Sequence, residues 1–461
     1  MADFELTSKV LAPGFAGWGV QFNQHVYAAY TGFAEEHLHE LDEKVLALHP
    51  QLVRIFYNER QQGDPADPAQ TAAQKDKWDS FVRTLRLAQR AGAAINVTWQ
   101  SGPKSTPAER ERSMARFAGV LDRLVTSGGA ENLRWVTIQN EPNCPPPRGK
   151  PKDTTPERLA DMYHRLDGRL SASGLREQIR FMGGDLLEGS RDRNSPLHHS
   201  RWFEHMSEHL ADLIDAYSVH IYWHYFDTAR FEHRLRDVRR IVDGLRNPRP
   251  LYVTEFGTRG RRPKGVIEPG EYRTGSTSAP IGQTNIAAFQ HAWFQIRAAQ
   301  LGYAGTVKWD CFAGKYDRTP QAFFTIGPPG PEGWPVFPTY YALKLFMLSV
   351  KPGWQIRGLT RRGGTTKQLA AFSSSAGGLA ILGLDSRGST ANGRSTVRVP
   401  YEIGGLPPGL PLRLVIWNKG GRGRLAGEAT ITTDARGTAH VAAPLHSVFA
   451  LTTEELPAEL S

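Results

Sequence analysis

The sequence predicts an α/β protein in which a (β/α)8 TIM barrel is followed by a C-terminal all-β sandwich domain. Short β-branched segments recur along the first two thirds of the chain, and helical patterns separate them. Near Val350 the composition changes to closely spaced alternating segments with Gly, Pro and Asn turns. The length of 461 residues suits a barrel with one accessory domain, and a hydrophobic content of 40% is typical of a globular protein.

Eight segments are short and apolar enough to form the buried strands of the barrel. They are Gly17–Phe22, Leu52–Phe56, Ala94–Trp99, Arg134–Asn140, Ile179–Gly184, Asp215–Ile221, Pro250–Glu255 and Gly305–Cys311. Amphipathic helix candidates lie between them, among them Trp78–Ala91, Pro107–Ser127, Pro156–Ser173, Ala229–Leu245 and Thr284–Leu301. Alternation at this spacing indicates a parallel sheet, and eight units favour a closed barrel. No Gly-x-Gly-x-x-Gly follows the first segment, which argues against a dinucleotide-binding fold.

The second domain is predicted from short alternating segments after the barrel. They include Leu369–Phe372, Leu379–Leu384, Thr396–Pro400, Leu412–Trp417 and Ser447–Thr452. We therefore expect a catalytic barrel over residues 1–349 and a β-sandwich over residues 350–461. The first 13 residues, which contain the apolar segment Phe4–Leu11, are expected either to pair with the sandwich or to cover the bottom of the barrel.

Charge and hydropathy exclude several kinds of partner. The net charge of +10 is a mild excess for this length and forms no basic stripe with a reading motif, so no nucleic-acid partner is expected. No apolar run reaches about 18 residues, so no membrane span is expected. The N-terminus lacks the basic start and apolar stretch of a signal peptide, which is typical of a cytoplasmic protein, or of a secreted one whose leader has been removed. Nothing in the sequence indicates the oligomeric state.

The two cysteines predict neither a disulfide nor a metal site. Cys144 follows the fourth strand and Cys311 ends the eighth, on opposite walls of the barrel, so free thiols are expected. The adjacent histidines His198 and His199 have no carboxylate nearby at metal-ligand spacing. The sequence therefore predicts no metal and no organic cofactor.

Two glutamates lie where two predicted barrel strands end. Glu141 follows the fourth strand and Glu255 ends the seventh, 114 residues later, which agrees with the three intervening units. Since these strand ends open on one cavity, we expect the two carboxyl groups to face each other. Other strand ends add Arg54, His220 and Tyr222. A pair of carboxyl groups in an aromatic-lined pocket suits the cleavage of a glycosidic bond, in which one is protonated and the other ionised.

Two segments resemble the catalytic motifs of the cellulase-like glycoside hydrolases of clan A. These segments are WVTIQNEPN, from Trp135 to Asn143, and LYVTEFG, from Leu251 to Gly257. The resemblance extends over the barrel, roughly residues 14 to 345, through the order of its motifs. The residues that match family positions are Arg54, Asn140, Glu141, His220, Tyr222, Glu255 and Trp309. Many cellulase-like members carry a histidine at the end of the third strand, where this sequence has Asn96, Thr98 and Trp99.

The resemblance implies a role for each matching residue. Glu255 is the expected nucleophile, kept ionised by Arg54 and Tyr222. Glu141 is the expected acid and then base, with a pKa above that of Glu255 in the free enzyme and a carboxyl separation of about 5 to 5.5 Å. In the remaining roles, Asn140 binds the 2-hydroxyl of the sugar, His220 faces the pocket beside Tyr222, and Trp309 stacks beneath the sugar.

Further residues near the strand ends have two possible roles. Trp99 is expected to contact substrate, although packing in the core suits this aromatic residue equally well. Asn23, after the first strand, is expected to reach sugar hydroxyls, with a solvated loop as the alternative. Asp185 and Glu188, after the fifth strand, are expected at the rim. A basic loop that follows Glu255 contains Arg259, Arg261, Arg262 and Lys264 and is expected to border the cleft, either solvated or against an acidic group.

The sequence therefore predicts a retaining β-glycoside hydrolase that acts on oligosaccharides or small glycosides. Exo-action is preferred because the long segments Asn143–Thr155 and Gly257–Pro280 have the length to close one end of the cleft. A transglycosidase with the same covalent intermediate and a non-catalytic carbohydrate-binding protein are the alternatives. The sugar, the linkage and the chain length remain open, because single contacts decide them.

Overall fold

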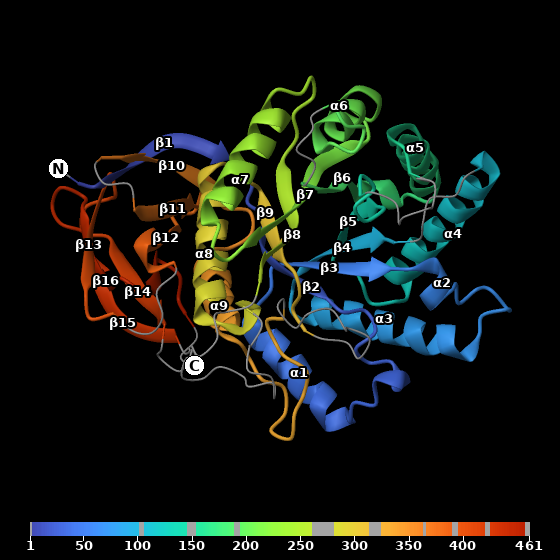
Figure 1. Ribbon diagram of the computed structural model, residues 1–461, viewed down its shortest axis with the longest axis horizontal. Coiled ribbons are helices and arrows are strands. Elements are labelled where there is room, and N and C mark those ends of the chain that lie inside the picture. Colours follow the sequence, from blue (N-terminus) through green and yellow to red (C-terminus); the bar gives the residue numbers. More distant parts are fainter. Residues whose placement is uncertain are drawn as a thin grey trace.

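The computed structural model describes residues 2–100, 106–144, 154–188, 194–260, 281–312, 324–362, 366–389, 395–419 and 425–456. Eight parallel strands close into a barrel (Figure 1), which confirms the predicted fold class. In chain order they are β2 (Gly17–Phe22), β3 (Leu52–Tyr57), β4 (Ala94–Trp99), β5 (Leu133–Ile138), β6 (Arg180–Leu187), β7 (Ile214–His224), β8 (Leu251–Arg259) and β9 (Gly305–Lys308). Each strand pairs with its neighbours in sequence order, and β9 pairs with β2 to close the ring.

Helices surround the barrel. They are α1 (Glu35–Leu48), α2 (Glu59–Gln62), α3 (Ala72–Arg90), α4 (Pro107–Thr126), α5 (Pro156–Ala172), α6 (His199–His209), α7 (Thr228–Asp243), α8 (Asn285–Gln300) and α9 (Pro338–Ser349). Thr71 and Thr106 begin α3 and α4 with capping boxes, in which each threonine side chain accepts a backbone N–H of the first turn. None of the helices in these described ranges is long and apolar enough to cross a bilayer.

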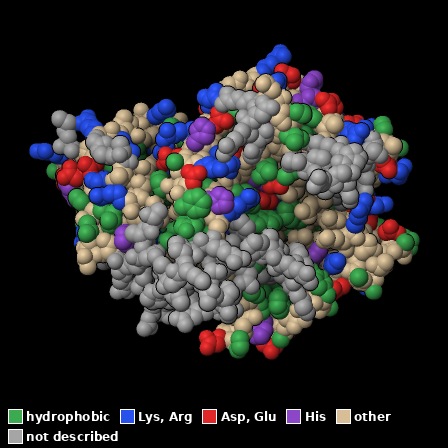
Figure 2. Space-filling model, in the orientation of Figure 1, with side chains coloured by type: hydrophobic (Ala, Val, Ile, Leu, Met, Phe, Trp, Pro, Cys, Tyr) green, Lys and Arg blue, Asp and Glu red, His purple; other side chains and the backbone are tan. Residues whose placement is uncertain are grey.

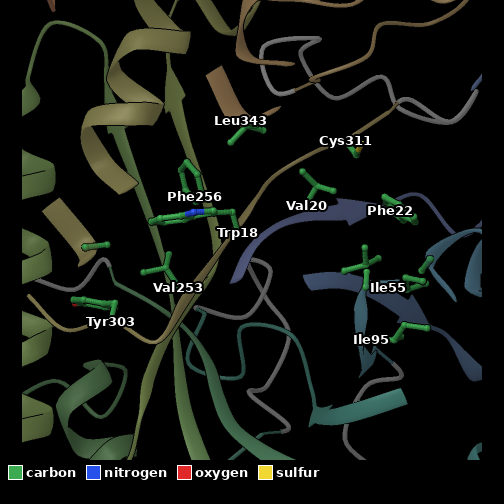
Figure 3. Close-up of a cluster of buried hydrophobic side chains, with 14 of the residues drawn as sticks. Trp18, Val20, Phe22, Ile55, Ile95, Val253, Phe256, Tyr303, Cys311 and Leu343 are labelled. Carbon is green, nitrogen blue, oxygen red and sulfur yellow. The ribbon is translucent and has the colours of Figure 1, made fainter. Parts of the chain in front are cut away.

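Side chains on the barrel strands alternate between two environments. The outward residues, such as Val20, Ile55, Ile95 and Val253, are fully buried against the helices, and Figure 3 shows them with Trp18, Phe256 and Leu343. The inward residues near the open end include polar and charged side chains, such as Arg54, which bonds Thr98 and Gln21. This alternation, with a period of two, decides which residues can reach the cavity at the strand ends.

Helix α8 differs from the amphipathic helix that the sequence predicts. All but two of its residues are buried. The helix lies between the barrel and the second domain (Figure 1), so it packs against barrel strands on one side and against β11 (Lys367–Ser373) on the other. A helix covered on both sides needs no polar face, which explains its Ala- and Phe-rich sequence.

The second domain is a nine-stranded, mostly antiparallel sheet that folds over on itself around its own core. Its strand order is β15-β14-β17-β12-β11-β10-β1-β13-β16. The remaining strands are β1 (Phe4–Ala12), β10 (Gln355–Arg361), β12 (Leu379–Asp385), β13 (Arg398–Gly404), β14 (Pro411–Asn418), β15 (Leu425–Thr432), β16 (Ala439–Pro444) and β17 (Ser447–Thr452). Tyr401 and Phe449 meet across the core with ring centroids 4.8 Å apart.

The N-terminal strand belongs to this sheet. Strand β1 pairs antiparallel with β10 and parallel with β13, and Phe4 is buried in the core of the sandwich. The chain therefore begins in the second domain, crosses into the barrel at Gly17 and returns after α9.

On the face shown in Figure 2, basic and acidic side chains are interspersed over both domains.

Candidate active site

Glu141 and Glu255 lie together at the carboxyl-terminal mouth of the barrel. Glu141 comes three residues after β5, and Glu255 lies in β8. A carboxylate oxygen of each, together with a ring nitrogen of His220, lies within 4.8 Å of the others. The Glu255 side chain is 6% exposed and that of Glu141 is 23% exposed. The more accessible carboxyl group is thus the one expected to exchange a proton with substrate.

Arg54 bonds the carboxylate of Glu255 from within the barrel. Its guanidinium is fully buried and donates to Oε1 of Glu255 at 2.7 Å. The same group donates to the side-chain oxygens of Asn140 at 2.7 Å and Gln21 at 3.1 Å. Arg54 lies on the inward face of β3, so its alternation with outward Val53 and Ile55 places the charge at the glutamate.

Tyr222 completes the surroundings of Glu255. Its phenol donates to Oε2 of Glu255 at 2.6 Å. Burial, followed by the negative charge of Glu255, raises the pKa of Tyr222 well above its ordinary value, so the phenol stays a donor. Each oxygen of Glu255 therefore accepts a bond from a group that favours the ionised carboxylate.

His220 lies between the two carboxylates. Its Nδ1 is 3.0 Å from Oε1 of Glu141 and 3.4 Å from Oε2 of Glu255. Burial lowers the pKa of His220, but Glu255, Asp185 and Glu141 together outweigh it and raise this pKa to about 9. The ring is therefore an imidazolium cation at neutral pH.

This cation changes the acidity of Glu141. Burial alone raises the pKa of Glu141, but the hydrogen bond and charge of His220 outweigh it, so the pKa lies below its ordinary value. The Cys144 thiol, 3.4 Å from Oε2 of Glu141, acts in the same direction. The pKa expected for Glu141 did not take account of an imidazolium beside it. His220 and Glu141 therefore titrate as a coupled pair that shares one proton.

The backbone near Glu141 is held in a rarely populated conformation. Gln139, Glu141 and Asp185 have φ angles of 72°, 46° and 48°, which favour glycine. The N–H of Glu141 donates to the carbonyl of Asp185 at 3.0 Å, and its carbonyl accepts from Cys144 at 2.9 Å. Residues held in such backbone conformations are concentrated at functional sites, where the surrounding contacts compensate for the strain.

Asp185 does not lie at the rim as expected. Its side chain is fully buried and bonds Arg54. The reason is that β6 extends to Leu187, so Asp185 lies within the strand and not in a loop after it. Glu188 is also largely buried, and its carboxylate pairs with Arg234. Sequence spacing located the strand, but neither its end nor the direction of these two side chains.

Two aromatic rings pack together near the Arg54 guanidinium. Trp309, just after β9, is half-buried, and its ring meets that of Phe56 at 5.8 Å between centroids. The Arg54 guanidinium lies 4.5 Å from the centre of the Phe56 ring. Phe56 was not among the predicted site residues, although its position two residues after Arg54 on β3 places both on one face.

Of two further predicted substrate contacts, Trp99 lies in the core, and Asn23 is buried in the turn after β2. Trp99 is fully buried with its ring 6.5 Å from that of Phe117 in α4, because it lies on the outward face while Thr98 points inward to Arg54. Its alternative role in the core is therefore the one observed. The side-chain oxygen of Asn23 accepts the N–H of His25 at 3.0 Å, so it stabilises the turn after β2.

Part of the predicted rim falls outside the described residues. This applies to Arg261, Arg262 and Lys264 of the basic loop and to most of the two long segments expected to wall the cleft. Arg259 is described, and its guanidinium lies 4.4 Å from the centre of the Tyr222 ring. Both cysteines are free thiols, as predicted.

Glu141, His220 and Glu255 are near enough to one another to hold a metal ion, but their contacts do not suit one. The positive guanidinium of Arg54 is already bonded to Glu255, and an imidazolium faces both carboxylates. A divalent cation there would meet two fixed positive charges and would need a deprotonated His220. The arrangement suits proton transfer and nucleophilic attack better than metal binding.

Comparisons with known proteins are informative for the fold. No family model matches the chain, and no curated protein matches its sequence. Among solved structures, the catalytic domain of GH30 xylanase C from Talaromyces cellulolyticus matches with a TM-score of 0.65 and 10% identity, over 98% of this chain and 100% of that chain. The α-L-arabinofuranosidase from Thermotoga maritima in its arabinose complex gives 0.64 and 13%, over 99% and 100%.

A conserved exported protein from Bacteroides fragilis matches with a TM-score of 0.69 and 9% identity, over 98% of this chain and 100% of that chain. Such identities establish the fold alone. The chain therefore shares with these three proteins a complete architecture in which a barrel is joined to a β-sandwich.

Proposed function

We propose that this protein is a retaining glycoside hydrolase of clan A that cleaves glycosidic bonds through a covalent glycosyl-enzyme. The observation that carries the proposal is the pair of carboxyl groups, whose oxygens lie within 4.8 Å of each other. Glu255 accepts from Arg54 and Tyr222, whereas Glu141 contacts His220. Retaining enzymes separate these groups by about 5–5.5 Å, whereas inverting enzymes need about 6.5–9.5 Å for a water molecule. The neighbours named xylanase and arabinofuranosidase agree with this class.

The first step follows from the contacts of each glutamate. An oxygen of Glu255 attacks the anomeric carbon while the bond to the leaving oxygen breaks, and Glu141 donates the proton that this oxygen takes up. Arg54 and Tyr222 donate to the two oxygens of Glu255 and orient the carboxylate for attack. The His220 imidazolium supplies the proton to Glu141 through its 3.0 Å contact.

The second step reverses these roles. Once Glu255 is esterified its negative charge is gone, and Glu141 as a carboxylate accepts a proton from water. The hydroxide oxygen forms the new bond to the anomeric carbon, and Glu255 leaves as a carboxylate. Arg54 and Tyr222 stabilise the charge that returns to Glu255. The anomeric configuration is inverted twice and so is retained.

Substrate binding is proposed for the groups around the carboxylates. The Trp309 ring provides a flat apolar surface for the C–H face of a sugar. Asn140 is fixed by Arg54 beside Glu141, where its side chain would bond the 2-hydroxyl. Neither group distinguishes a xyloside from an arabinofuranoside or a glucoside.

The experiment is a panel of activated aryl glycosides, including β-xylosides, β-glucosides and α-L-arabinofuranosides, with proton NMR of the first anomer formed. Retention is expected, together with labelling of Glu255 by the matching 2-fluoroglycoside in mass spectrometry. Glu255→Ala should abolish both, and Trp99→Phe, which changes a ring in the core, should preserve both. An inverted product or a label on another residue would exclude the proposed nucleophile.

Exo-action is a finer part of the proposal. It is supported by the length of the segments Asn143–Thr155 and Gly257–Pro280, which follow the two glutamates in the sequence. Digestion of an end-labelled oligosaccharide of the sugar selected by the panel should release single residues from one end from the earliest times. A spread of intermediate lengths at early times would indicate endo-action instead.

A further inference from the structure

Asp185 lies beneath the two glutamates and contacts partners of both. Its side chain is fully buried, and its Oδ2 accepts from Nε of Arg54 at 3.1 Å and from NH2 of Arg54 at 2.5 Å. A third nitrogen of Arg54 bonds Glu255. Oδ1 of Asp185 lies 3.7 Å from Nε2 of His220, whose other nitrogen bonds Glu141. One carboxylate therefore touches the cation beside each glutamate.

Hydroxyl groups from three strands hold this carboxylate. Ser218 and Thr254 donate to Oδ1 at 2.9 and 2.5 Å, and Thr98 donates to Oδ2 at 3.2 Å. Burial raises the pKa of Asp185, but the charge of Arg54, the interaction with His220 and the bond from Thr254 outweigh it and keep the pKa well below its ordinary value. The carboxylate is therefore ionised throughout the working pH range.

The backbone of Asp185 also reaches the site. Its carbonyl accepts the N–H of Glu141 at 3.0 Å, and its own N–H donates to the hydroxyl of Ser218 at 2.7 Å. The φ angle of 48° at Asp185 turns the chain so that the carbonyl faces Glu141 while the side chain points inward. Both halves of the residue thus contribute to the geometry around Glu141.

We propose that Asp185 is a positioning residue that fixes Arg54 against Glu255 and His220 against Glu141. It acts through these two cations and, being fully buried beneath them, is not a residue that touches substrate. The inference rests on the proposed hydrolase function and adds to it the group that sets the charge balance of the site. A carboxylate is required because a neutral side chain would leave two buried cations with only the two reacting glutamates as counter-ions.

Removing this charge has a defined effect on proton binding. The charged and titratable groups around His220 are Glu141, Asp185, Glu255, Arg54 and Tyr222. The Asp185→Asn substitution removes one of the three negative charges, so His220 and Glu141 lose their shared proton at a lower pH. The basic limb of the kcat/KM profile should therefore move to lower pH.

The test compares Asp185→Asn with Asp385→Asn. Asp385 in β12 is a matched control because its side chain is also fully buried and pairs with an arginine, Arg387 at 2.7 Å, in the second domain. For Asp185→Asn we expect kcat to fall about 10²-fold with KM changed less than about threefold. The basic limb should shift by about one pH unit or more. Asp385→Asn should keep the wild-type limb.

Ser218→Ala serves if Asp185→Asn fails to fold, because it removes both hydroxyl contacts to Asp185 and leaves the charge. Its kcat should fall several-fold. The inference is overturned if Asp185→Asn keeps the wild-type kcat and an unshifted basic limb. Where Asp185→Asn does not fold, the inference is overturned if Ser218→Ala keeps the wild-type kcat. In either case, labelling of Glu255 would still support the hydrolase. A wild-type protein that hydrolyses no glycoside and takes no label would reject both.

Discussion

Arg54 and Glu255 form an ion pair of 2.7 Å in which the guanidinium is fully buried and the carboxylate is 6% exposed. The two residues lie on β3 and β8, which do not pair with each other in the barrel. Their contact crosses the interior of the barrel, so it depends on closure of the whole sheet. The same ion pair therefore joins the proposed nucleophile to the interior of the barrel, so we expect its loss to affect both activity and stability.

Substitution of Arg54 should lower the free energy of unfolding more than substitution of an arginine at the surface. Arg54→Met leaves Asp185 and Glu255 buried without their main cation, so the free energy of unfolding should fall by about 3–5 kcal/mol. Arg83→Met is the control, because Arg83 pairs with Glu35 at the surface, where about 1 kcal/mol or less is expected. Urea unfolding followed by circular dichroism measures both, and equal losses would contradict the linkage.

Tyr222→Phe should weaken catalysis without changing the fold. The substitution removes one hydroxyl that donates to Glu255 at 2.6 Å, and a bond to a charged group contributes about 1.5–3 kcal/mol. We expect kcat/KM to fall about 10- to 100-fold on the best aryl glycoside of the panel. The melting temperature should fall by only a few degrees, because about 1.5–3 kcal/mol is small against the unfolding enthalpy of a chain of this length, and unaltered kinetics would show that the phenol does not support the nucleophile.

Glu141→Gln should affect substrates according to their leaving groups. Proton donation contributes about 10²–10⁴-fold where the leaving oxygen is basic and little where it is already acidic. The variant should therefore lose far more activity on an alkyl glycoside or oligosaccharide than on a dinitrophenyl glycoside. Rates for a series of leaving groups test this, and equal losses across the series would remove Glu141 from the role of acid.

The stability of the protein should depend on pH through His220. Its pKa is raised to about 9 from an ordinary value of 6.5, so its contribution to stability is complete below about pH 6.5 and is lost as the pH rises through 9. The difference in free energy of unfolding between wild type and His220→Gln should shrink over this range. The comparison between the two proteins cancels the contributions of other titrating groups. One of these is Lys308, because burial lowers its pKa to about 7.

Much of the architecture follows from short-range patterns. The ranges predicted for the barrel strands agree with the observed ones within a few residues at most ends, because β-branched segments between helical patterns mark buried parallel strands. The start of the helix expected from Pro107 was predictable, and a capping box at Thr106 fixes it in the structure. The environment of α8 was not, because only the contact between the two domains covers its second side.

The sequence by itself determined that the two glutamates lie in the carboxyl-terminal regions of the fourth and seventh barrel strands, Glu141 just after one and Glu255 within the other, since motif and spacing place them there. Only the tertiary structure decided that Trp99 faces the helices, that Phe56 lies beside Trp309, and that Asp185 is buried beneath both glutamates. The physical reason is that residue order sets where a strand ends, whereas the direction of each side chain and its electrostatic partners depend on strands brought together from the whole barrel.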